Sequence, residues 1–252
     1  MTKSTPSSRT IVIIGATSAI AAACAEIYAR QQNHLVLVGR SAAKLERLQA
    51  HLKVVGAASV QSMQQDLSQI EQHEALIQRL TADAKRLDVV LLAHGTLGDQ
   101  ETASVQPALL ADVMRDNAIS HMSLLALLTP VMERQGQGTL AVITSVAGDR
   151  GRPSNYVYGA AKGALSVFVD GLRGRLFRHG VAVVNIKPGF VSTPMTAHLK
   201  QGVLFVQPEV VAHGIVRAIA HGCHTVYLPS FWRYIMLIIR LIPEVVFKRL
   251  SL

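Results

Sequence analysis

TIVIIGATSAIA, at residues 10–21, is the most informative stretch of this 252-residue sequence. A run of four apolar, β-branched residues, Ile11–Ile14, ends just before Gly15, and a segment of helical composition follows. Backbone N–H groups in such a turn, together with the N-terminus of the next helix, can face a pyrophosphate. We expect Gly15 to supply the tight turn, with Thr17, Ser18 and Ile20 beside the bound group. The same connection also occurs without a ligand, so the motif needs support from the rest of the chain.

Short apolar runs alternate with longer amphipathic segments along the rest of the sequence. The expected strands are Thr10–Ile14, His34–Val38, Ser59–Gln64, Asp88–Ala93, Thr139–Ser145, Ala182–Lys187 and Thr225–Leu228. The expected helices include Ser18–Gln31, Ala42–Val54 and Gln69–Lys85. Strands rich in Val, Ile and Leu that are separated by helices indicate a parallel sheet covered on both faces. We therefore predict an α/β fold, a Rossmann-type doubly wound parallel sheet of about seven strands with helices on both faces.

Composition supports a single folded domain over residues 1–252. Half of the residues are hydrophobic and 16% are charged. The charged fraction is below the ~25% usual for soluble domains. This composition excludes an intrinsically disordered chain. Residues 1–8 are expected to form a loose tail, and residues 230–252 an amphipathic C-terminal extension.

The net charge of +9 is unevenly distributed. Residues 1–150 contain 13 basic and 13 acidic side chains, whereas residues 151–252 contain 12 basic and 3 acidic ones. This asymmetry favours an anionic partner, which includes nucleic acid, an acidic membrane surface and a phosphorylated ligand. Scattered, solvated charge is the alternative. A nucleic-acid partner is not expected, because the sequence contains no recognisable nucleic-acid-binding module.

The cysteines and the N-terminus favour a cytoplasmic protein. Cys24 and Cys223 belong to no metal-binding or disulfide pattern, so no metal site is expected and a reducing compartment is the simplest interpretation. A signal peptide around Ile11–Ile14 is an alternative, but Gly15 interrupts that apolar run. Uninterrupted apolar runs are too short to predict a membrane-spanning helix.

The end of the second expected strand indicates which dinucleotide binds. It reads Val38-Gly39-Arg40-Ser41 and contains no acidic residue. In dinucleotide-binding folds an acidic residue here binds the ribose 2′-OH, whereas an arginine accommodates a 2′-phosphate. Arg40 therefore predicts a preference for NADP(H), with NAD(H) as the alternative cofactor. A surface arginine at the start of the next helix is the other interpretation.

A second constellation suggests proton transfer. Tyr158 and Lys162 are four residues apart in a helical stretch, which places both on one face. A cation beside a phenol lowers its pKa from about 10, so the tyrosine can exchange a proton with a carbonyl oxygen. Ser145 ends the fifth expected strand, at the carboxyl edge where ligands bind in such sheets.

Together these residues resemble the short-chain dehydrogenase/reductase family, from Thr10 to about Leu228. The matching positions are the Gly15 turn, Asp66-Leu67, Ala93-His94-Gly95, Asn117, Ser145, Tyr158, Lys162, Pro188-Gly189 and Thr193. The resemblance implies that Tyr158 protonates the carbonyl oxygen, that Lys162 lowers its pKa and holds the nicotinamide ribose, and that Ser145 orients the carbonyl. It also implies a homodimer or homotetramer.

The same resemblance assigns further residues. Asn117 is expected to hold a water in the proton relay, Asp66 to contact the adenine, and Thr193 to contact the carboxamide. The cofactor-binding set expected in full is Gly15, Thr17, Ser18, Ile20, Arg40, Asp66, Leu67, Ala93, Gly95, Lys162, Pro188, Gly189, Val191 and Thr193.

The sequence departs from the family pattern on the cofactor side. Two fingerprint glycines are replaced by Ala19 and Ala21, and the usual Asn-Asn-Ala-Gly reads Leu-Ala-His-Gly at residues 92–95. His94, His121 and His198 show no metal-ligand spacing and are interpreted as separate structural or surface histidines.

The C-terminal segment, residues 231–250, is both apolar and basic. Arg233 and Arg240 are seven residues apart on one helix face, with Trp232 and Tyr234 close by. A basic edge with aromatic anchors is typical of a helix at a membrane interface. We expect peripheral membrane contact through residues 231–250, on the inner face of the plasma membrane. Docking of this helix on the protein core or on another subunit is the alternative.

Four further runs narrow the resemblance. Residues 144–148, 152–158, 195–200 and 232–236 are similar to those of decaprenylphosphoryl-2-keto-erythro-pentose reductases, a subgroup of the same family. That similarity implies reduction of the 2-keto group of a pentose carried on a polyprenyl phosphate. A soluble reductase of a ketoacyl or other small carbonyl substrate is the first alternative. A non-catalytic dinucleotide-sensing protein is the second.

Overall fold

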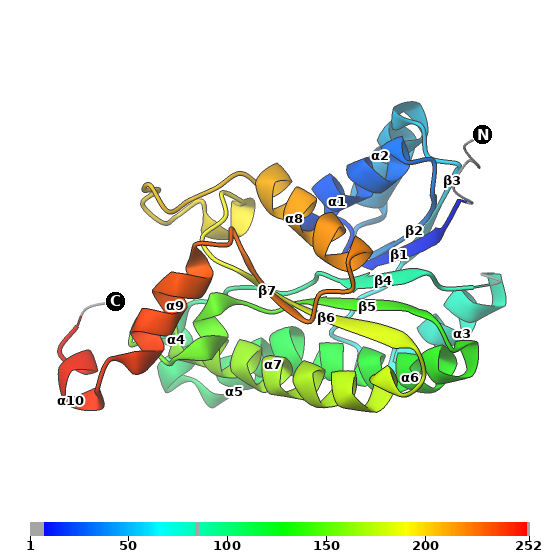
Figure 1. Cartoon of the computed structure of the whole chain (residues 1–252). Helices are drawn as coiled ribbons and strands as arrows, with labels where there is room; N and C mark the ends of the chain where they lie inside the picture. The colour runs from blue at the N-terminus through cyan, green and yellow to red at the C-terminus, as the bar shows by residue number, and fades with distance from the viewer. Residues whose placement is uncertain (1–7, 84–85, 251–252) are drawn as a thin grey trace, which may run out of the picture.

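The seven expected strands all form in the computed structural model, which describes residues 8–83 and 86–250. They pair in parallel in the order β3-β2-β1-β4-β5-β6-β7 (Figure 1). Their bounds are β1 (Thr10–Ile14), β2 (His34–Gly39), β3 (Ser59–Gln64), β4 (Val89–Leu92), β5 (Gly138–Ile143), β6 (Val181–Pro188) and β7 (Thr225–Leu228). The predicted fold class is therefore confirmed. The strand order reverses between β1 and β4, which is where ligands bind in open sheets of this kind.

Ten α-helices and four shorter helical turns connect the strands within the described residues. The helices are α1 (Ala19–Arg30), α2 (Ala42–Val55), α3 (His73–Asp83), α4 (Gln100–Val105), α5 (Pro107–Met114), α6 (Ser120–Gln135), α7 (Tyr156–Phe177), α8 (Pro208–Ala220), α9 (Trp232–Leu241) and α10 (Glu244–Phe247). The turns are η1 (Ile70–Gln72), η2 (Arg115–Ile119), η3 (Val146–Asp149) and η4 (Pro194–Thr196).

Two details differ from the expected elements. Ser145 was expected to end the fifth strand, but β5 ends at Ile143 and Ser145 caps η3 by accepting a hydrogen bond from the Ala147 N–H at 3.1 Å. The segment from residue 69 to residue 85 was expected to form one helix, but it begins as the short turn η1 and continues as α3. Residues 1–7 of the expected tail, residues 84 and 85 of that helix, and residues 251 and 252 of the expected C-terminal extension lie outside the described residues.

Alternate residues of β1 build two separate cores. Ile11 and Ile13 pack with buried residues of α1, α2 and α8 on one face of the sheet. Val12 and Ile14 pack with those of α3, α6 and α7 on the other face. This division follows from the two-residue period of a strand. Both faces are covered, as the apolar composition of the strands predicts.

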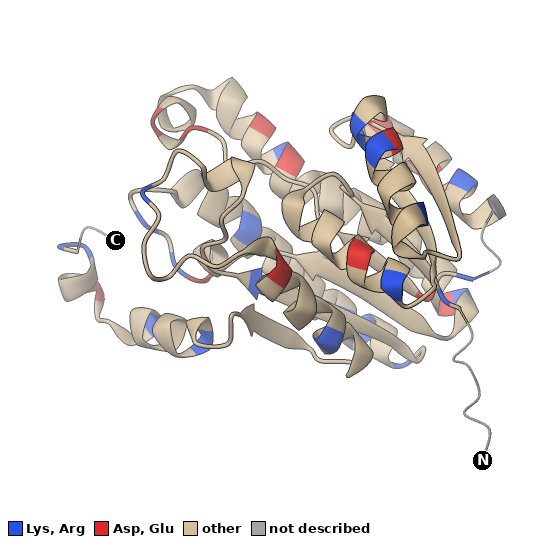
Figure 2. Cartoon of the chain, turned by 90° about the horizontal axis from the view of Figure 1, so that it is seen from above, with Lys and Arg blue, Asp and Glu red and all other residues tan. Residues whose placement is uncertain are grey.

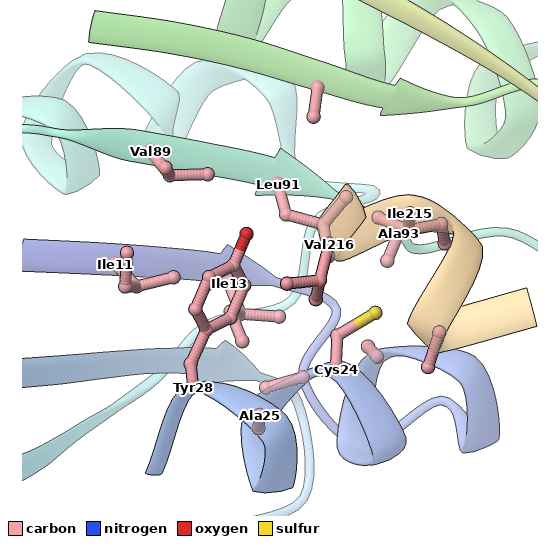
Figure 3. Packing of buried hydrophobic residues seen from close by; sticks show 14 of the residues in the cluster. Ile11, Ile13, Cys24, Ala25, Tyr28, Val89, Leu91, Ala93, Ile215 and Val216 are labelled. Carbon is pink, nitrogen blue, oxygen red and sulfur yellow. The ribbon is translucent and has the colours of Figure 1, made fainter. Parts of the chain in front are cut away.

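The first of these cores is tightly filled (Figure 3). Cys24 and Tyr28 of α1 lie against β1, and Val216 approaches from α8. All three are buried, with Cys24 and Tyr28 fully inaccessible to solvent. Ser18 caps the start of α1, since its side chain accepts a hydrogen bond from the Ala21 N–H at 3.3 Å. These contacts fix the helix N-terminus at the carboxyl edge of the sheet.

The C-terminal extension docks beyond the carboxyl ends of the strands (Figure 1). Trp232 and Met236 of α9 are buried against Val146 and a surrounding apolar cluster. A Cβ atom at Gly189 would lie 1.9 Å from the Trp232 indole nitrogen, so only glycine leaves room for this ring. No helix within the described residues is both long enough and apolar enough to cross a bilayer.

Arg150 anchors the far end of the extension. Its Nη1 donates to the carbonyl oxygen of Ile242 at 2.7 Å, and its Nη2 donates to the Glu244 carboxylate at 2.9 Å. Its guanidinium carbon lies 3.6 Å from the centroid of the Phe247 ring. Docking of the C-terminal helix on the core was the expected alternative to membrane contact. It therefore describes one side of the extension.

Replacing Gly189 with Ala is expected to displace α9, because the added methyl group occupies the volume of the Trp232 ring. Overpacking of this kind costs about 1–3 kcal/mol of stability. Trp232 is the only tryptophan in the chain, so its fluorescence reports the displacement as a shift to longer wavelength. Gly171→Ala in α7 is the control, since its Cβ meets open space. If the emission of Gly189→Ala were unchanged, the expected clash between the added methyl group and the Trp232 ring would be contradicted.

Candidate active site

A cavity of about 960 Å³ opens at the carboxyl edge of the sheet, next to the point where the strand order reverses. Every residue of the expected catalytic and cofactor-binding sets lines it. These residues come from the ends of six strands, β1 to β6, and the segments that follow them, and from η2, α1 and α7. The structure thus brings together side chains that are distant in the sequence, while their individual roles remain predictions.

Gly15 brings two strand ends close together. Its φ of +86° lies in the left-handed region, and a Cβ atom there would lie 2.5 Å from the His94 backbone nitrogen. The N–H groups of Gly15 and Ala16 both donate to the carbonyl oxygen of Val38 at 2.9 Å. This hydrogen bonding ties the turn after β1 to the end of β2. A turn with no side chain leaves room for a pyrophosphate at the N-terminus of α1.

Gly95 permits a similarly close approach at the catalytic end of the cavity. Its φ is +149°, and a Cβ atom would lie 2.6 Å from Asn117 Oδ1 and 3.5 Å from Lys162 Nζ. Gly95 is the glycine of the Leu-Ala-His-Gly segment, and this close approach requires a glycine at that position. A side chain at Gly15 or at Gly95 would fill space that fits the backbone of a dinucleotide.

Asn117 lies in η2, a π-helical turn between α5 and α6, and is fully buried. Its Oδ1 accepts a hydrogen bond from the Thr96 N–H at 3.1 Å, and its Nδ2 donates to the Val113 carbonyl at 3.0 Å. The amide therefore holds the loop after β4 against α5. Its expected water contact stays a prediction.

Lys162 and Tyr158 share one face of α7, as their spacing predicts. The Lys162 side chain is buried and its Nζ donates to the Ile143 carbonyl at 3.2 Å. Burial lowers the pKa of Lys162 to about 7. Burial also raises the pKa of Tyr158 to about 12, although interaction with the Ser145 side chain lowers it in part.

The expectation that Lys162 lowers the pKa of Tyr158 stays a prediction, because it depends on Lys162 being charged. The ammonium group of Lys162 is itself desolvated, which disfavours its charged form. Its Nζ lies 5.8 Å from the centroid of the phenol ring. Polar groups added near Nζ, such as the hydroxyls of a ribose, would favour the charged form of Lys162 and bring the phenol pKa down.

His94 and His121 form a contact that their sequence positions do not reveal. Their rings stack with centroids 3.6 Å apart and planes at 9°. His94 Nε2 lies 2.9 Å from Ser120 Oγ, which itself donates to the Leu67 carbonyl oxygen at 2.6 Å. Burial lowers the pKa of both rings well below the ordinary value, so they are neutral at pH 7. The expectation that these histidines are separate is therefore wrong for this pair, and His94 Nδ1 and both ring nitrogens of His121 are buried without a hydrogen-bond partner.

The cofactor end contains one further basic group that the sequence did not single out. Lys44, in the first turn of α2, lines the same cavity as Arg40. Asp66 also lines it, and hydrogen bonds from the Ser68 N–H and hydroxyl hold the pKa of the Asp66 carboxyl below its usual value. The spacing of Lys44 from Arg40, four residues at a helix start, is the signal that could have identified it.

Two other side chains complete the cavity wall. His198 is exposed on the loop after β6, whereas Arg152 is buried between η3 and α7. No cluster of three or more His, Cys, Asp or Glu residues in the described ranges is arranged to hold a metal ion.

The family model for short chain dehydrogenase matches residues 9–203 of this chain. An uncharacterized oxidoreductase of Mycobacterium tuberculosis is 35% identical over 240 residues, which span 95% of this chain and 96% of the relative. The ketoacyl reductase HetN of Nostoc is 28% identical over 216 residues, which span 84% of this chain and 75% of the relative.

Solved structures agree with the fold. A variant of actinorhodin polyketide ketoreductase crystallised with NADPH has a TM-score of 0.79 at 22% identity, covering 88% of this chain and 95% of its own. A 3-oxoacyl-[acyl-carrier protein] reductase from Brucella melitensis has a TM-score of 0.75 at 21% identity, covering 87% of this chain and 90% of its own.

The buried position of Lys162 predicts a pH-dependent stability. An unfolded lysine has a pKa of about 10.4, so between pH 7 and pH 10 the unfolded chain binds more protons than the folded one. Stability contributed by Lys162 therefore rises with pH across this window. Between pH 7 and pH 9 the free energy of unfolding, measured in urea, should rise by roughly 1–3 kcal/mol relative to Lys162→Met. Lys53→Met on exposed α2 is the control, and a pH-independent difference between wild type and Lys162→Met would contradict the burial argument.

Proposed function

The chain belongs to the short-chain dehydrogenase/reductase family, and from this premise we propose that it is an NADP(H)-dependent reductase that converts a ketone to a secondary alcohol. The convergence of Ser145, Tyr158 and Lys162 in one cavity with the Gly15 turn is the observation that carries the proposal. Enzymes of this family use NAD(P), and the chain is an oxidoreductase of that kind.

Each catalytic side chain has a defined part in the reduction. NADPH, when bound, supplies the hydride that forms the new C–H bond. The Tyr158 hydroxyl donates its proton to the carbonyl oxygen, on which the electron pair of the C=O bond collects. The Ser145 hydroxyl orients that oxygen by a hydrogen bond. Lys162, in its charged form, stabilises the phenolate that Tyr158 becomes.

Replacing Tyr158 with Phe tests the proposal. Loss of the proton donor should lower kcat for NADPH-dependent ketone reduction by about 10²-fold or more. The affinity for NADPH should change little. Tyr156→Phe is the matched control, because Tyr156 lies on the same helix but is exposed. Full activity of Tyr158→Phe, or the absence of any ketone that oxidises NADPH, would favour the alternative of a non-catalytic dinucleotide-sensing protein.

Preference for NADP(H) over NAD(H) is part of the proposal. Arg40 and Lys44 line the cavity at the end of β2, and no acidic residue occupies positions 38–41. Two cations there suit the 2′-phosphate of NADP(H) and give NAD(H) no equivalent contact. The solved ketoreductase with NADPH named above supports the same choice.

Arg40→Ala should weaken NADPH binding about 10-fold, because one charge-assisted hydrogen bond to the 2′-phosphate is lost at an exposed site. NADH affinity should stay within about 2-fold of the wild-type value. Fluorescence titration with each dinucleotide measures both. Arg47→Ala is the control on the exposed face of α2, where Arg47 donates to the Ala43 carbonyl. If Arg40→Ala lost affinity for NADPH and for NADH to the same extent, Arg40 would have no part in cofactor selection.

The C-terminal extension supports a lipid-borne substrate. Six large apolar side chains of α9 and α10 are half or more exposed, and we call them the C-terminal apolar face: Tyr234, Leu237, Ile238, Leu241, Val245 and Val246. The four members in α9 follow the three- and four-residue spacing of one helical stripe. The opposite side of α9 packs through Trp232 and Met236 against residues that line the cavity, Val146 and Arg152. A ligand held at the stripe would therefore lie near the cavity wall.

Charge indicates which surface the face contacts. The same segment contains the basic residues Arg233, Arg240, Lys248 and Arg249, and α9 contains no acidic residue (Figure 2). Glu244 is the only acidic residue of the 231–250 segment and is paired with Arg150 at 2.9 Å. Basic residues around an apolar stripe complement an anionic lipid surface. We therefore propose that this face makes peripheral contact with an anionic membrane, such as the inner side of the plasma membrane.

Flotation with phosphatidylglycerol-containing vesicles tests this contact. The wild-type chain should float with the vesicles, and Leu237→Gln/Ile238→Gln/Leu241→Gln should remain with the soluble fraction. Val54→Gln/Phe177→Gln is the control, because both residues are exposed apolar side chains elsewhere on the surface. A wild type that does not float contradicts the proposal. A wild-type dimer that the triple variant converts to a monomer would assign the face to a second copy instead.

The substrate that we favour is a 2-keto pentose carried on a polyprenyl phosphate. It combines a carbonyl for Ser145 and Tyr158 with a lipid for the C-terminal apolar face. The second candidate is a soluble reductase of a ketoacyl substrate, which is favoured by the activities for which HetN and the two solved reductases are named. A homodimer or homotetramer is proposed from the family alone.

A further inference from the structure

Arg152 is a buried cation that the proposed chemistry does not use. It follows η3 by three residues and lines the cavity beside Ser145 and Tyr158. Only 8% of its surface is exposed. Burying a guanidinium costs free energy unless an anion or several hydrogen-bond acceptors compensate it. The partners available to Arg152 therefore decide what it is for.

The acidic residue closest in sequence is already engaged. Asp149 accepts a hydrogen bond from Lys187 Nζ at 2.5 Å and from the Tyr227 hydroxyl at 2.7 Å. Both of its oxygens are used by these two groups. Among residues 8–83 and 86–250, no carboxylate lies within ion-pair distance of Arg152. The negative charge of Asp149 favours the charged form of Arg152 only from a distance, while burial lowers the pKa of the guanidinium.

The guanidinium atoms themselves are poorly compensated. Nε is buried and has no hydrogen-bond partner, and Nη2 lies 4.0 Å from the sulfur of Met236 in α9. Arg150, two residues earlier, shows the contrast, because it binds carbonyl oxygens and Glu244. Near Arg152, the buried Oδ1 of Asn155 also lacks a partner. The cavity wall thus presents one unused cationic donor and one unused acceptor.

We infer that Arg152 is the binding site for a phosphate group of the substrate, at the side of the cavity that faces α9. Arg152 offers planar N–H donors to phosphate oxygens, and an anionic ligand compensates a buried guanidinium better than water does. The inference rests on the proposed function, because it names part of the substrate that the reductase holds.

Location links this site to the membrane contact. Met236, which touches Arg152, belongs to the same helix as the C-terminal apolar face. A phosphate bound at Arg152 therefore lies between the catalytic residues and the stripe that meets lipid. Two kinds of substrate carry such a phosphate: a lipid-borne sugar and an acyl group on a phosphopantetheine arm. The chemistry that Arg152 recognises is the same in both.

Isothermal titration of the NADP⁺-saturated enzyme tests the site without turnover. Saturation with NADP⁺ removes phosphate binding at Arg40 from the measurement. The probes are geranyl phosphate against geraniol, and 4′-phosphopantetheine against pantetheine. In at least one pair the wild type should bind the phosphorylated member about 10- to 100-fold more tightly. A preference in the geranyl pair assigns a lipid-borne substrate, and a preference in the pantetheine pair assigns a carrier-borne one.

Variants then locate the preference. Arg152→Gln should abolish it, Arg152→Lys should restore part of it, and Arg217→Gln, an exposed arginine on α8, should retain it. NADP⁺ affinity and Trp232 emission of Arg152→Gln report whether the cavity and α9 remain in place. Equal affinities within both pairs for the wild type, or an undiminished preference in a folded Arg152→Gln, would overturn the inference.

The two proposals fail separately. An enzyme that prefers phosphorylated probes through Arg152 but reduces no ketone would overturn the proposed function and leave the phosphate site standing. An enzyme that reduces ketones but shows no preference for phosphorylated probes would overturn the phosphate site and leave the proposed function standing.

Discussion

The close approach of two backbone segments, at the ends of β1 and β4, is the constraint on which the rest of the site depends. Because β1 pairs in parallel with β2 on one side and β4 on the other, the chain reverses its order there and leaves a crevice. Gly15 permits the approach, since a Cβ atom would lie 2.5 Å from the His94 nitrogen. The same segment then reaches Asn117 and Lys162 through Gly95. One steric requirement thus joins the cofactor end of the cavity to its catalytic end.

The excess positive charge divides into places with different physical settings. Lys162 is buried and has a pKa lowered to about 7, so the surroundings at Nζ decide whether it is charged. Arg150 is used structurally, since it holds the end of the C-terminal extension. Arg152 is buried without an anionic partner within the described residues, whereas Arg233 and Arg240 are exposed residues of the helix that carries the apolar stripe. A net charge alone does not distinguish these settings, whereas burial and partners do.

Local patterns in the sequence were sufficient for the sheet but not for the site's electrostatics. The strands formed within two residues of their expected bounds, because apolar β-forming runs and glycine turns are encoded locally. The stacking of His94 on His121 joins residues 27 positions apart and has no local signal. The unpartnered state of Arg152 was equally hidden, because Asp149, three residues earlier, is engaged by β6 and β7 residues. The raised pKa of Tyr158 likewise depends on burial that helix spacing does not report.

A crystal structure of the chain with NADP⁺ bound tests the central claim most directly, because it shows which end of the crevice holds which end of the dinucleotide. The account predicts the pyrophosphate at the Gly15 turn, the 2′-phosphate beside Arg40 and Lys44, and the nicotinamide ribose beside Tyr158 and Lys162. A dinucleotide bound away from the Gly15 turn, or one whose nicotinamide lies at Arg40, would contradict it.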